Sequence, residues 1–128
     1  MKAKVTHIGI YTPDLERLKE FYIKYFDAEC NEKYENDEGF SSYFLTFDSD
    51  VRVEIMANTH LEYHPFKDLE SGMNHLAFSV GTKEKVIALT KQLEEDGYEV
   101  VSSPRMTGDG YFESKVSDPD GNSIEITM

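Results

Sequence analysis

The chain has 128 residues, of which 39% are hydrophobic and 12% aromatic, which suits one compact domain and argues against disorder. A formal net charge of −12 repels phosphate backbones and anionic membrane surfaces, and no apolar run reaches membrane-spanning length, so neither nucleic acid nor a membrane is an expected partner. A single cysteine, Cys30, and an N-terminal stretch without a signal-peptide apolar core favour a cytoplasmic location.

The first half of the chain is predicted to form a strand, a helix and three strands. Residues 5–11 alternate apolar and polar side chains, as a half-buried strand does. Thr12 and Pro13 match an N-cap and a first helical residue, and apolar side chains at spacings of three and four extend the helix to Phe26. Strands are expected over residues 29–34, 41–47 and 51–57.

The second half repeats this order after a polar linker, residues 59–72, in which a short helical turn is expected near residues 66–69. A strand contains His75, and a helix is predicted to begin after Thr82 and to stop at Gly97. Three further strands are expected over residues 98–103, 111–117 and 123–128, with a turn at 118–122.

Two short matches indicate that the halves are repeats. "THIGIY" resembles "NHLAFS" with histidine in the same place, and "VRVEIM" resembles "NSIEIT" with glutamate in the same place. Glu54 follows His7 at nearly the same separation as Glu125 follows His75. Strand alternation turns each of the four side chains away from its apolar neighbours, onto the opposite face of its sheet.

Two imidazoles and two carboxylates on such faces suit a divalent transition-metal ion. Nitrogen and oxygen ligands fit Ni, Co, Zn, Mn or Fe(II), and an octahedral ion would keep about two positions open for water or substrate. Each residue alone also fits a hydrogen-bonded structural histidine or a solvated surface glutamate. The matched separations favour a metal site formed by His7, Glu54, His75 and Glu125.

The chain resembles the vicinal oxygen chelate superfamily, which contains glyoxalase I, fosfomycin-resistance transferases, extradiol dioxygenases and bleomycin-binding proteins. The resemblance covers nearly the whole chain and lies in "THIGIYTPDLERLKEFY", "RVEIM", "NHLAFSV" and "DPDGNSIEI". It implies an α+β fold, a single domain of two βαβββ modules at about residues 1–58 and 73–128, whose curved sheets form a metal-binding cup.

Within this superfamily, the resemblance points to glyoxalase I. Its metal ligands correspond to the two histidines and two glutamates, whereas the transferases and dioxygenases typically use two histidines and one glutamate. The extra carboxylate, Glu54, therefore favours a glyoxalase I-like site. The lack of long insertions resembles the shorter bacterial glyoxalases, which implies one Ni or Co ion, with Zn, Mn and Fe as alternatives.

The implied activity is that of a lactoylglutathione lyase-like metalloenzyme. It would isomerise a hemithioacetal or a related α-hydroxycarbonyl small molecule by proton transfer through a metal-stabilised enediolate. The resemblance makes Glu125 the base and Glu54 a ligand or proton donor, while His7 and His75 hold the ion.

Four further residues are candidates for binding substrate. Tyr11 stands where glutathione-dependent glyoxalases carry an arginine, whereas Asn58 matches their glutathione-contacting asparagine, so the thiol stays open. Arg105 is a candidate for holding an acidic group and Tyr111 for donating a hydrogen bond. The alternative for these two is a flexible hairpin with one exposed arginine.

Three other functions compete with this one. A thiol transferase or an extradiol-type dioxygenase would use the same scaffold, and a drug-binding protein would use it without catalysis, generally without the metal ligands. The cup could be completed within one chain or across a homodimer, and the sequence leaves both open.

Overall fold

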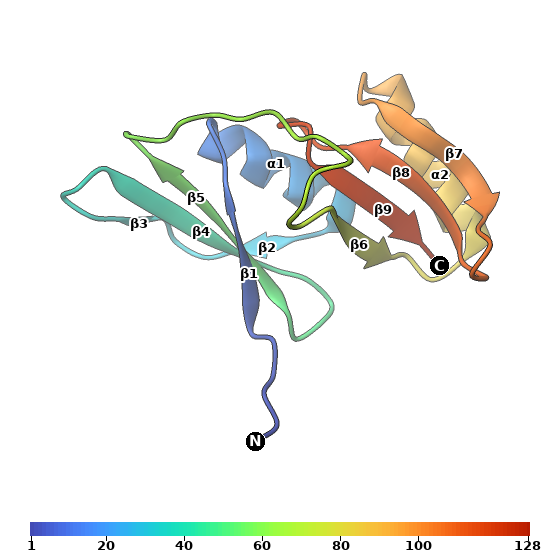
Figure 1. Cartoon of the computed structure of the whole chain (residues 1–128), viewed down its shortest axis with the longest axis horizontal. Helices are drawn as coiled ribbons and strands as arrows, with labels where there is room; N and C mark the ends of the chain where they lie inside the picture. Colours follow the sequence, from blue (N-terminus) through green and yellow to red (C-terminus); the bar gives the residue numbers. More distant parts are fainter. The chain divides into compact units, whose positions relative to one another are not determined.

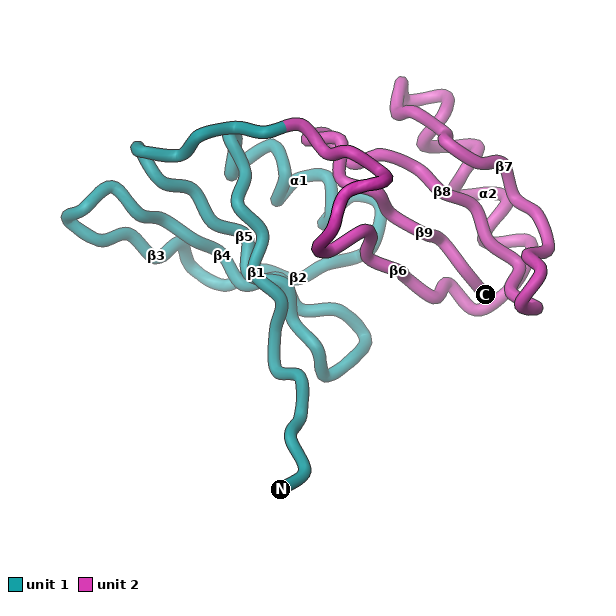
Figure 2. The backbone as a smooth tube through the Cα atoms, viewed as in Figure 1, with its two compact units in different colours: residues 1–64 teal, residues 65–128 magenta.

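The structure is a computed structural model that describes residues 1–128 as two compact units, Met1–His64 and Pro65–Met128 (Figure 2). In each unit, one helix packs on one face of a sheet (Figure 1). Unit 2 follows the βαβββ plan, and unit 1 follows it with the first strand after its helix divided into two short pieces, so the predicted α+β fold is confirmed. Neither helix is long and apolar enough to cross a membrane.

Unit 1 contains a mixed sheet ordered β1-β5-β4-β2, with β3 also paired to β4. Strand β1 runs parallel to β5, and β5 runs antiparallel to β4. The elements are β1 (His7–Tyr11), α1 (Leu15–Phe26), β2 (Glu29–Cys30), β3 (Tyr34–Glu35), β4 (Phe40–Thr46) and β5 (Arg52–Asn58).

Helix α1 covers the face of this sheet that carries its apolar residues. The buried side chains are Leu15, Leu18, Phe21, Tyr22 and Tyr25 from the helix and Tyr43, Leu45, Val53 and Ile55 from the sheet. Burying such residues is the main stabilising contribution to the unit, about 1.5–3 kcal/mol for each large apolar side chain. The opposite face carries His7 and Glu54 together with the apolar side chains of Phe44 and Met56.

The predicted start of α1 is wrong by two residues. Asp14, not Thr12, is the N-cap, and its Oδ1 accepts a hydrogen bond from the Arg17 amide at 3.1 Å. The Thr12 hydroxyl instead accepts from the Asp14 amide at 3.1 Å, which forms a turn before the helix. The Asp14 carboxylate also interacts favourably with the positive end of the helix dipole, an advantage that a threonine cap lacks.

The single strand expected over residues 29–34 is also wrong, because β2 and β3 are separated by residues 31–33. Asn31 Oδ1 accepts a hydrogen bond from the Phe44 amide at 2.8 Å. A side-chain acceptor thereby replaces a backbone one and interrupts the ladder.

Unit 2 contains a sheet ordered β6-β9-β8-β7, in which only β6 and β9 are parallel. The elements are β6 (His75–Ser79), α2 (Lys83–Glu95), β7 (Val100–Met106), β8 (Phe112–Ser117) and β9 (Ser123–Thr127). Helix α2 buries Val86, Thr90 and Leu93 on the sheet side chains Ser114, Val116, Ile124 and Ile126.

The predicted limits of α2 are confirmed. Thr82 is its N-cap, accepting from the Lys85 amide at 3.2 Å, and Gly97 follows the helix with φ +93°. The helical turn expected near residues 66–69 does not form a helix. Residues 68–69 form a single turn instead.

Candidate functional site

The first candidate pair lies in unit 1, on the sheet face opposite α1. His7 is on edge strand β1 with Arg52 as its register partner, and Gly9, two residues further, pairs with Glu54 on β5. His7 and Glu54 are therefore diagonal neighbours on one face. His7 Nε2 lies 3.9 Å from Glu54 Oε1.

The second pair, in unit 2, has the same construction. His75 on edge strand β6 pairs with Ser123, and Ala77, two residues further, pairs with Glu125 on β9. His75 Nε2 lies 3.1 Å from Glu125 Oε2. The glutamate side chain of each pair is only 19% exposed, which differs from an ordinary solvated surface carboxylate.

The residue before His75 holds the other nitrogen of its ring. Asn74 Oδ1 lies 2.8 Å from His75 Nδ1, and Asn74 Nδ2 donates to Asp68 O and to Asp68 Oδ1, both at 3.1 Å. Since the amide nitrogen is used on Asp68, its oxygen accepts the Nδ1–H of His75. The Nε2 therefore faces the Glu125 carboxylate, to which it can donate an N–H, or beside which it can offer a lone pair to a bound cation.

His7 has a similar support. Thr6 Oγ1 lies 2.9 Å from His7 Nδ1 and can act as donor or acceptor. A ring nitrogen held in this way orients the other nitrogen, as is usual for histidines that bind metals. Each pair therefore offers one imidazole nitrogen and one carboxylate, which fit a divalent transition-metal ion.

A lysine and a second glutamate surround Glu125. Lys115, the register partner of Glu125 on β8, places its Nζ 4.0 Å from Glu125 Oε1. Glu113, two residues earlier, is 8% exposed, and its Oε2 is buried without a hydrogen-bond partner. Burial raises the pKa of the Glu113 carboxyl, and the hydrogen bond and charge of Glu125 raise it further, whereas nearby Arg105 lowers it.

The neighbourhood of Glu54 is different. Its register partner on β4 is Phe44, whose ring lies edge-on to the His7 ring at 5.3 Å between centroids. The Arg52 guanidinium stands over the same Phe44 ring, 4.3 Å from its centroid. Each pair therefore has one basic side chain nearby, Arg52 in unit 1 and Lys115 in unit 2. The two basic residues occupy different positions of the repeat.

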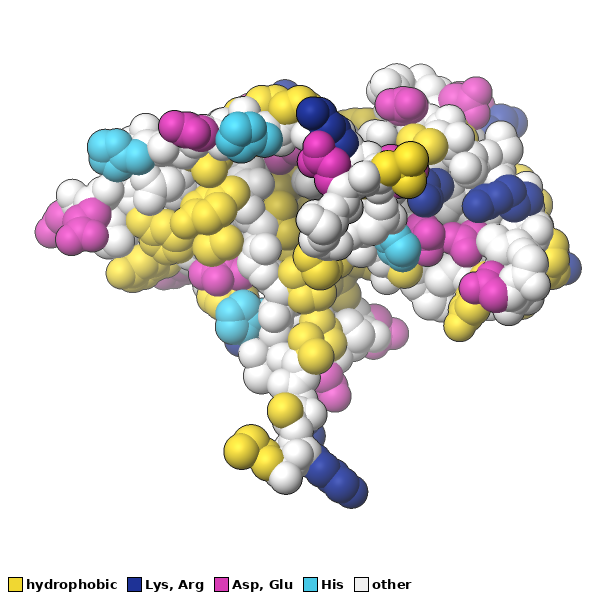
Figure 3. Space-filling view, in the orientation of Figure 1, with side chains coloured by type: hydrophobic (Ala, Val, Ile, Leu, Met, Phe, Trp, Pro, Cys, Tyr) yellow, Lys and Arg dark blue, Asp and Glu magenta, His cyan; other side chains and the backbone are white.

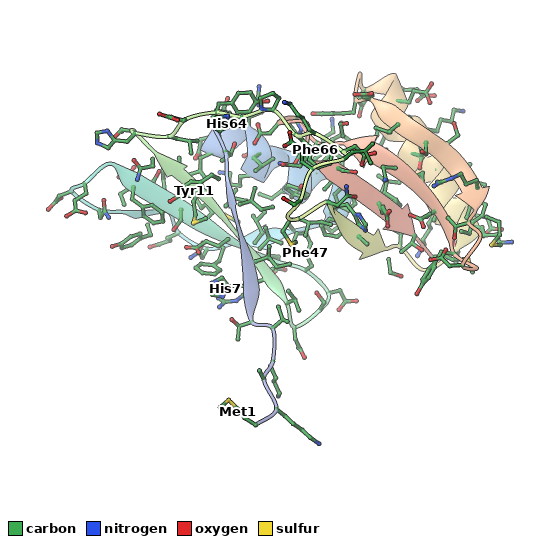
Figure 4. All side chains as sticks on the ribbon, in the orientation of Figure 1. Met1, His7, Tyr11, Phe47, His64 and Phe66 are labelled. Carbon is green, nitrogen blue, oxygen red and sulfur yellow. The ribbon has the colours of Figure 1, made fainter.

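The four predicted substrate-binding residues are spread over both units. Tyr11 ends β1 at the opposite end from His7 and is half exposed (Figure 4). Asn58 ends β5 and its Oδ1 accepts from the His60 amide at 2.9 Å. Arg105 donates from Nη1 to Glu113 O at 3.3 Å, and Tyr111 is exposed in the turn after β7.

The structure brings His7 next to Glu54 and His75 next to Glu125. No group of three or more His, Cys, Asp or Glu side chains is arranged to hold a metal ion. Each unit by itself therefore supplies two of the four predicted ligands.

Four neighbours of these pairs were missed by sequence reasoning: Thr6, Asn74, Glu113 and Lys115. The sequence contains a signal for Glu113 and Lys115, because they alternate with Ser114 and Val116, which are buried under α2. Strand alternation then turns Glu113 and Lys115 to the face that carries Glu125.

A family model described as the Glyoxalase/Bleomycin resistance protein/Dioxygenase superfamily matches residues 4–126. The uncharacterized protein YqjT of Bacillus subtilis is 29% identical over 123 residues, 94% of this chain and 94% of its own length. A glyoxylase/bleomycin resistance protein/dioxygenase domain from Frankia has a similar structure, with a TM-score of 0.85, 16% identity, and 100% of this chain and 98% of that chain covered. Glyoxalase I from Zea mays superposes with a TM-score of 0.80 and 22% identity over 97% of this chain, which spans 44% of that larger chain.

Proposed function

The chain belongs to the glyoxalase/bleomycin resistance protein/dioxygenase superfamily, and we propose that it is a metal-dependent, glyoxalase I-like lyase or isomerase. Its substrate would be a hemithioacetal or a related α-hydroxycarbonyl small molecule, in which a proton moves between adjacent carbons. One observation carries the proposal: both units place a histidine and a glutamate at the same register offset, with the histidine Nε2 facing the carboxylate.

The two pairs would together supply four ligands to one divalent ion, Ni or Co in preference to Zn, Mn or Fe(II). They would come from one chain or from two copies in a homodimer. When bound, the metal would polarise the substrate carbonyl and stabilise negative charge on its oxygens. The proposed ligands are His7, Glu54, His75 and Glu125.

The proposed base is Glu125, with Glu54 as ligand or proton donor. Glu125 has two charged neighbours, since His75 Nε2 lies at 3.1 Å and Lys115 Nζ lies at 4.0 Å, and the buried Glu113 is on the same face of the sheet. Such close packing limits the orientations of the carboxylate. A positioned base removes a proton far faster than a carboxylate free in water.

The remainder of the substrate would contact the polar groups near the pairs. Tyr11 and Asn58 lie along the strands that carry His7 and Glu54, and Arg105 and Tyr111 lie on or after β7. Glutathione or another low-molecular-weight thiol would supply the thiol portion. A thiol substrate also suits the reducing cytoplasm that a single cysteine favours.

The test is metal reconstitution. The protein is stripped of metal, reloaded separately with Ni, Co, Zn, Mn or Fe(II), and assayed with methylglyoxal plus glutathione, plus other thiols, and without thiol. We expect metal-dependent formation of a thioester or hydroxyacid, and about one metal ion bound for each set of two pairs. Light scattering on the same samples reports whether the loaded form is a monomer or a homodimer.

A matched control separates the candidate ligands from other histidines. His75→Ala should lose both metal and turnover, whereas His64→Ala should lose neither, because the His64 side chain is 83% exposed and lies outside the pairs. Oxygen consumption, or loss of thiol onto an epoxide, would replace the isomerase by a dioxygenase or a thiol transferase. Failure to bind any of these ions would contradict the proposal and favour a small-molecule-binding protein.

A further inference from the structure

We infer that Lys115 selects substrates that carry an anionic oxygen group, a carboxylate or a phosphonate-type group, next to the carbonyl on which the proposed reaction acts. The inference rests on the proposed function and adds a substrate class to it. The lysine is part of unit 2 alone, so its surroundings are defined by the sheet that carries His75 and Glu125.

The strand register gives Lys115 its position. It lies on β8 directly opposite Glu125, with Ser114 and Val116 on either side of it in sequence and buried under α2. Its side chain therefore points to the face of the candidate pair, and it is 22% exposed. A substrate whose carbonyl reaches Glu125 comes within a few bond lengths of this ammonium group.

The fold does not require a cation at this position. In unit 1 the register partner of the equivalent glutamate is Phe44, an uncharged ring. The chain as a whole is strongly acidic, with Asp and Glu side chains scattered over the visible face (Figure 3). A partly buried lysine beside the candidate base is thus a departure both from the repeat and from the general charge of the chain.

Glu125 does not accept a hydrogen bond from the Lys115 ammonium group. A separation of 4.0 Å is too long for a hydrogen bond. When Glu125 binds a divalent ion, its negative charge is shared with that ion, so it compensates the positive charge of Lys115 less completely. An ammonium with three donors can then bind an oxyanion, whereas Arg105 already donates to a backbone oxygen, that of Glu113.

The test uses three ligands with the same metal-binding head. Acetohydroxamate carries a methyl group, malonomonohydroxamate a carboxylate and phosphonoacetohydroxamate a phosphonate. Their affinities for metal-loaded protein are measured by calorimetry and corrected for their affinities for the free metal ion. We expect at least one acidic ligand to bind about tenfold or more tightly than acetohydroxamate, and the better of the two identifies the preferred anion.

Three variants locate the source of this gain. Lys115→Met should abolish the affinity difference between the acidic ligands and acetohydroxamate, compared at equal metal content, and Lys115→Arg should keep most of that difference. Lys83→Met is the matched control, because Lys83 lies over the Phe112 ring at the start of α2 and its loss removes the same charge from unit 2. This control should keep the full gain.

Two results would overturn the inference, and they are distinguishable. In the first, acetohydroxamate binds, but the acidic ligands bind no more tightly, or their higher affinity persists in Lys115→Met. Lys115 then does not select anions, and the proposed function stands. If the protein takes up no metal and binds none of the three ligands, the proposed function fails and the inference fails with it.

Discussion

Unit 1 and unit 2 place their histidine and glutamate at the same offset of a parallel strand pair, but they surround the glutamate differently. Its register partner is Phe44 in unit 1 and Lys115 in unit 2. The separation between imidazole and carboxylate is 3.9 Å in unit 1 and 3.1 Å in unit 2.

The partner of the histidine differs as well, being Arg52 in unit 1 and Ser123 in unit 2. Each unit therefore has one cation close to its pair, but on a different strand. The comparison separates two levels of organisation. The backbone register determines where the pair lies, and the residue on the next strand determines the charge around it.

The largest expected effect is on turnover and tests whether the glutamates have different roles. Glu125→Gln should lower kcat by roughly 100-fold or more at saturating metal, because the proposed base is lost. Glu54→Gln should cost less, since it removes only a ligand or proton donor. Metal content and circular dichroism confirm that each variant is loaded and folded. An equal or larger loss in Glu54→Gln would reverse the two roles.

The next effect concerns the cores of the two units. Ile55 and Ile126 are the residues that follow the glutamates, and both are fully buried under a helix. Replacing either with alanine should lower the free energy of unfolding by about 2–4 kcal/mol, because the cavity cannot fully collapse. Urea unfolding measures the loss, and Ile87→Ala on the half-exposed face of α2 should cost less than about 0.5 kcal/mol.

The same unfolding curves show whether the units are independent. If they unfold separately, each variant shifts only the transition of its own unit. One shared transition that both variants shift would mean that the two units unfold cooperatively.

A smaller effect concerns the supports of the two imidazoles. Asn74→Leu should weaken metal binding by about tenfold, because the amide that orients the His75 ring is itself held by Asp68. Thr6→Val should cost less, since the Thr6 hydroxyl can rotate. Competition with a chelator measures both affinities. A larger loss for Thr6→Val would show that the support in unit 1 is the more important one.

The smallest expected effect concerns the side-chain hydrogen bond that joins the sheet to the helix in each unit. We call this hydrogen bond the sheet–helix link. Tyr43 and Ser114 have equivalent register partners, Ile55 and Ile126. Tyr43 donates to Glu16 Oε1 on α1 at 2.8 Å, whereas Ser114 shares a hydrogen bond of 2.7 Å with Thr90 on α2. One link contains a titratable group and the other does not.

This difference predicts a different pH dependence of stability. The Tyr43 hydroxyl, followed by Lys19, lowers the pKa of Glu16, and Glu16 in turn raises the pKa of Lys19 to about 12. A lowered carboxyl pKa stabilises the fold above its ordinary value and loses that contribution as the pH falls through the folded value. Tyr43→Phe should therefore cost about 0.5–1 kcal/mol at neutral pH, with solvent screening included, and less in acid.

Ser114→Ala is the control, because its cost should not change over the same pH range. Thermal unfolding of both variants against the parent chain at neutral and acid pH measures the contrast. A constant cost for Tyr43→Phe would show that the charge of Glu16 adds nothing to this link.

Strand alternation and the internal repeat were enough to predict which face each candidate ligand occupies. His7 and His75 lie on edge strands with identical alternation of exposure, a pattern local to each strand. The neighbours Lys115 and Glu113 could not be assigned to Glu125 in this way. Their proximity depends on the register between β8 and β9, which the turn at residues 118–122 determines through hydrogen bonds to Asp118.

The errors in the predicted helix and strand limits occur where side chains compete for backbone hydrogen-bond partners. Thr12 and Asp14 are both good N-caps, and their order in the chain does not tell which one reaches the Arg17 amide. Asn31 interrupts a strand because its side chain reaches the Phe44 amide, a partner distant in sequence. Such contacts become visible only when the tertiary partner is known.

The parallel pairing of β1 with β5 also constrains how this chain can change in length. Hydrogen bonds at both ends hold the register, from the Arg52 amide to Thr6 O at 3.1 Å and from the Thr12 amide to Met56 O at 2.8 Å. Deleting one residue inside β1 would shift the strand and turn the imidazole to the helix side of the sheet. Insertions and deletions are therefore compatible with the candidate site in the connections between strands, and incompatible with it inside the four short strands that carry the pairs.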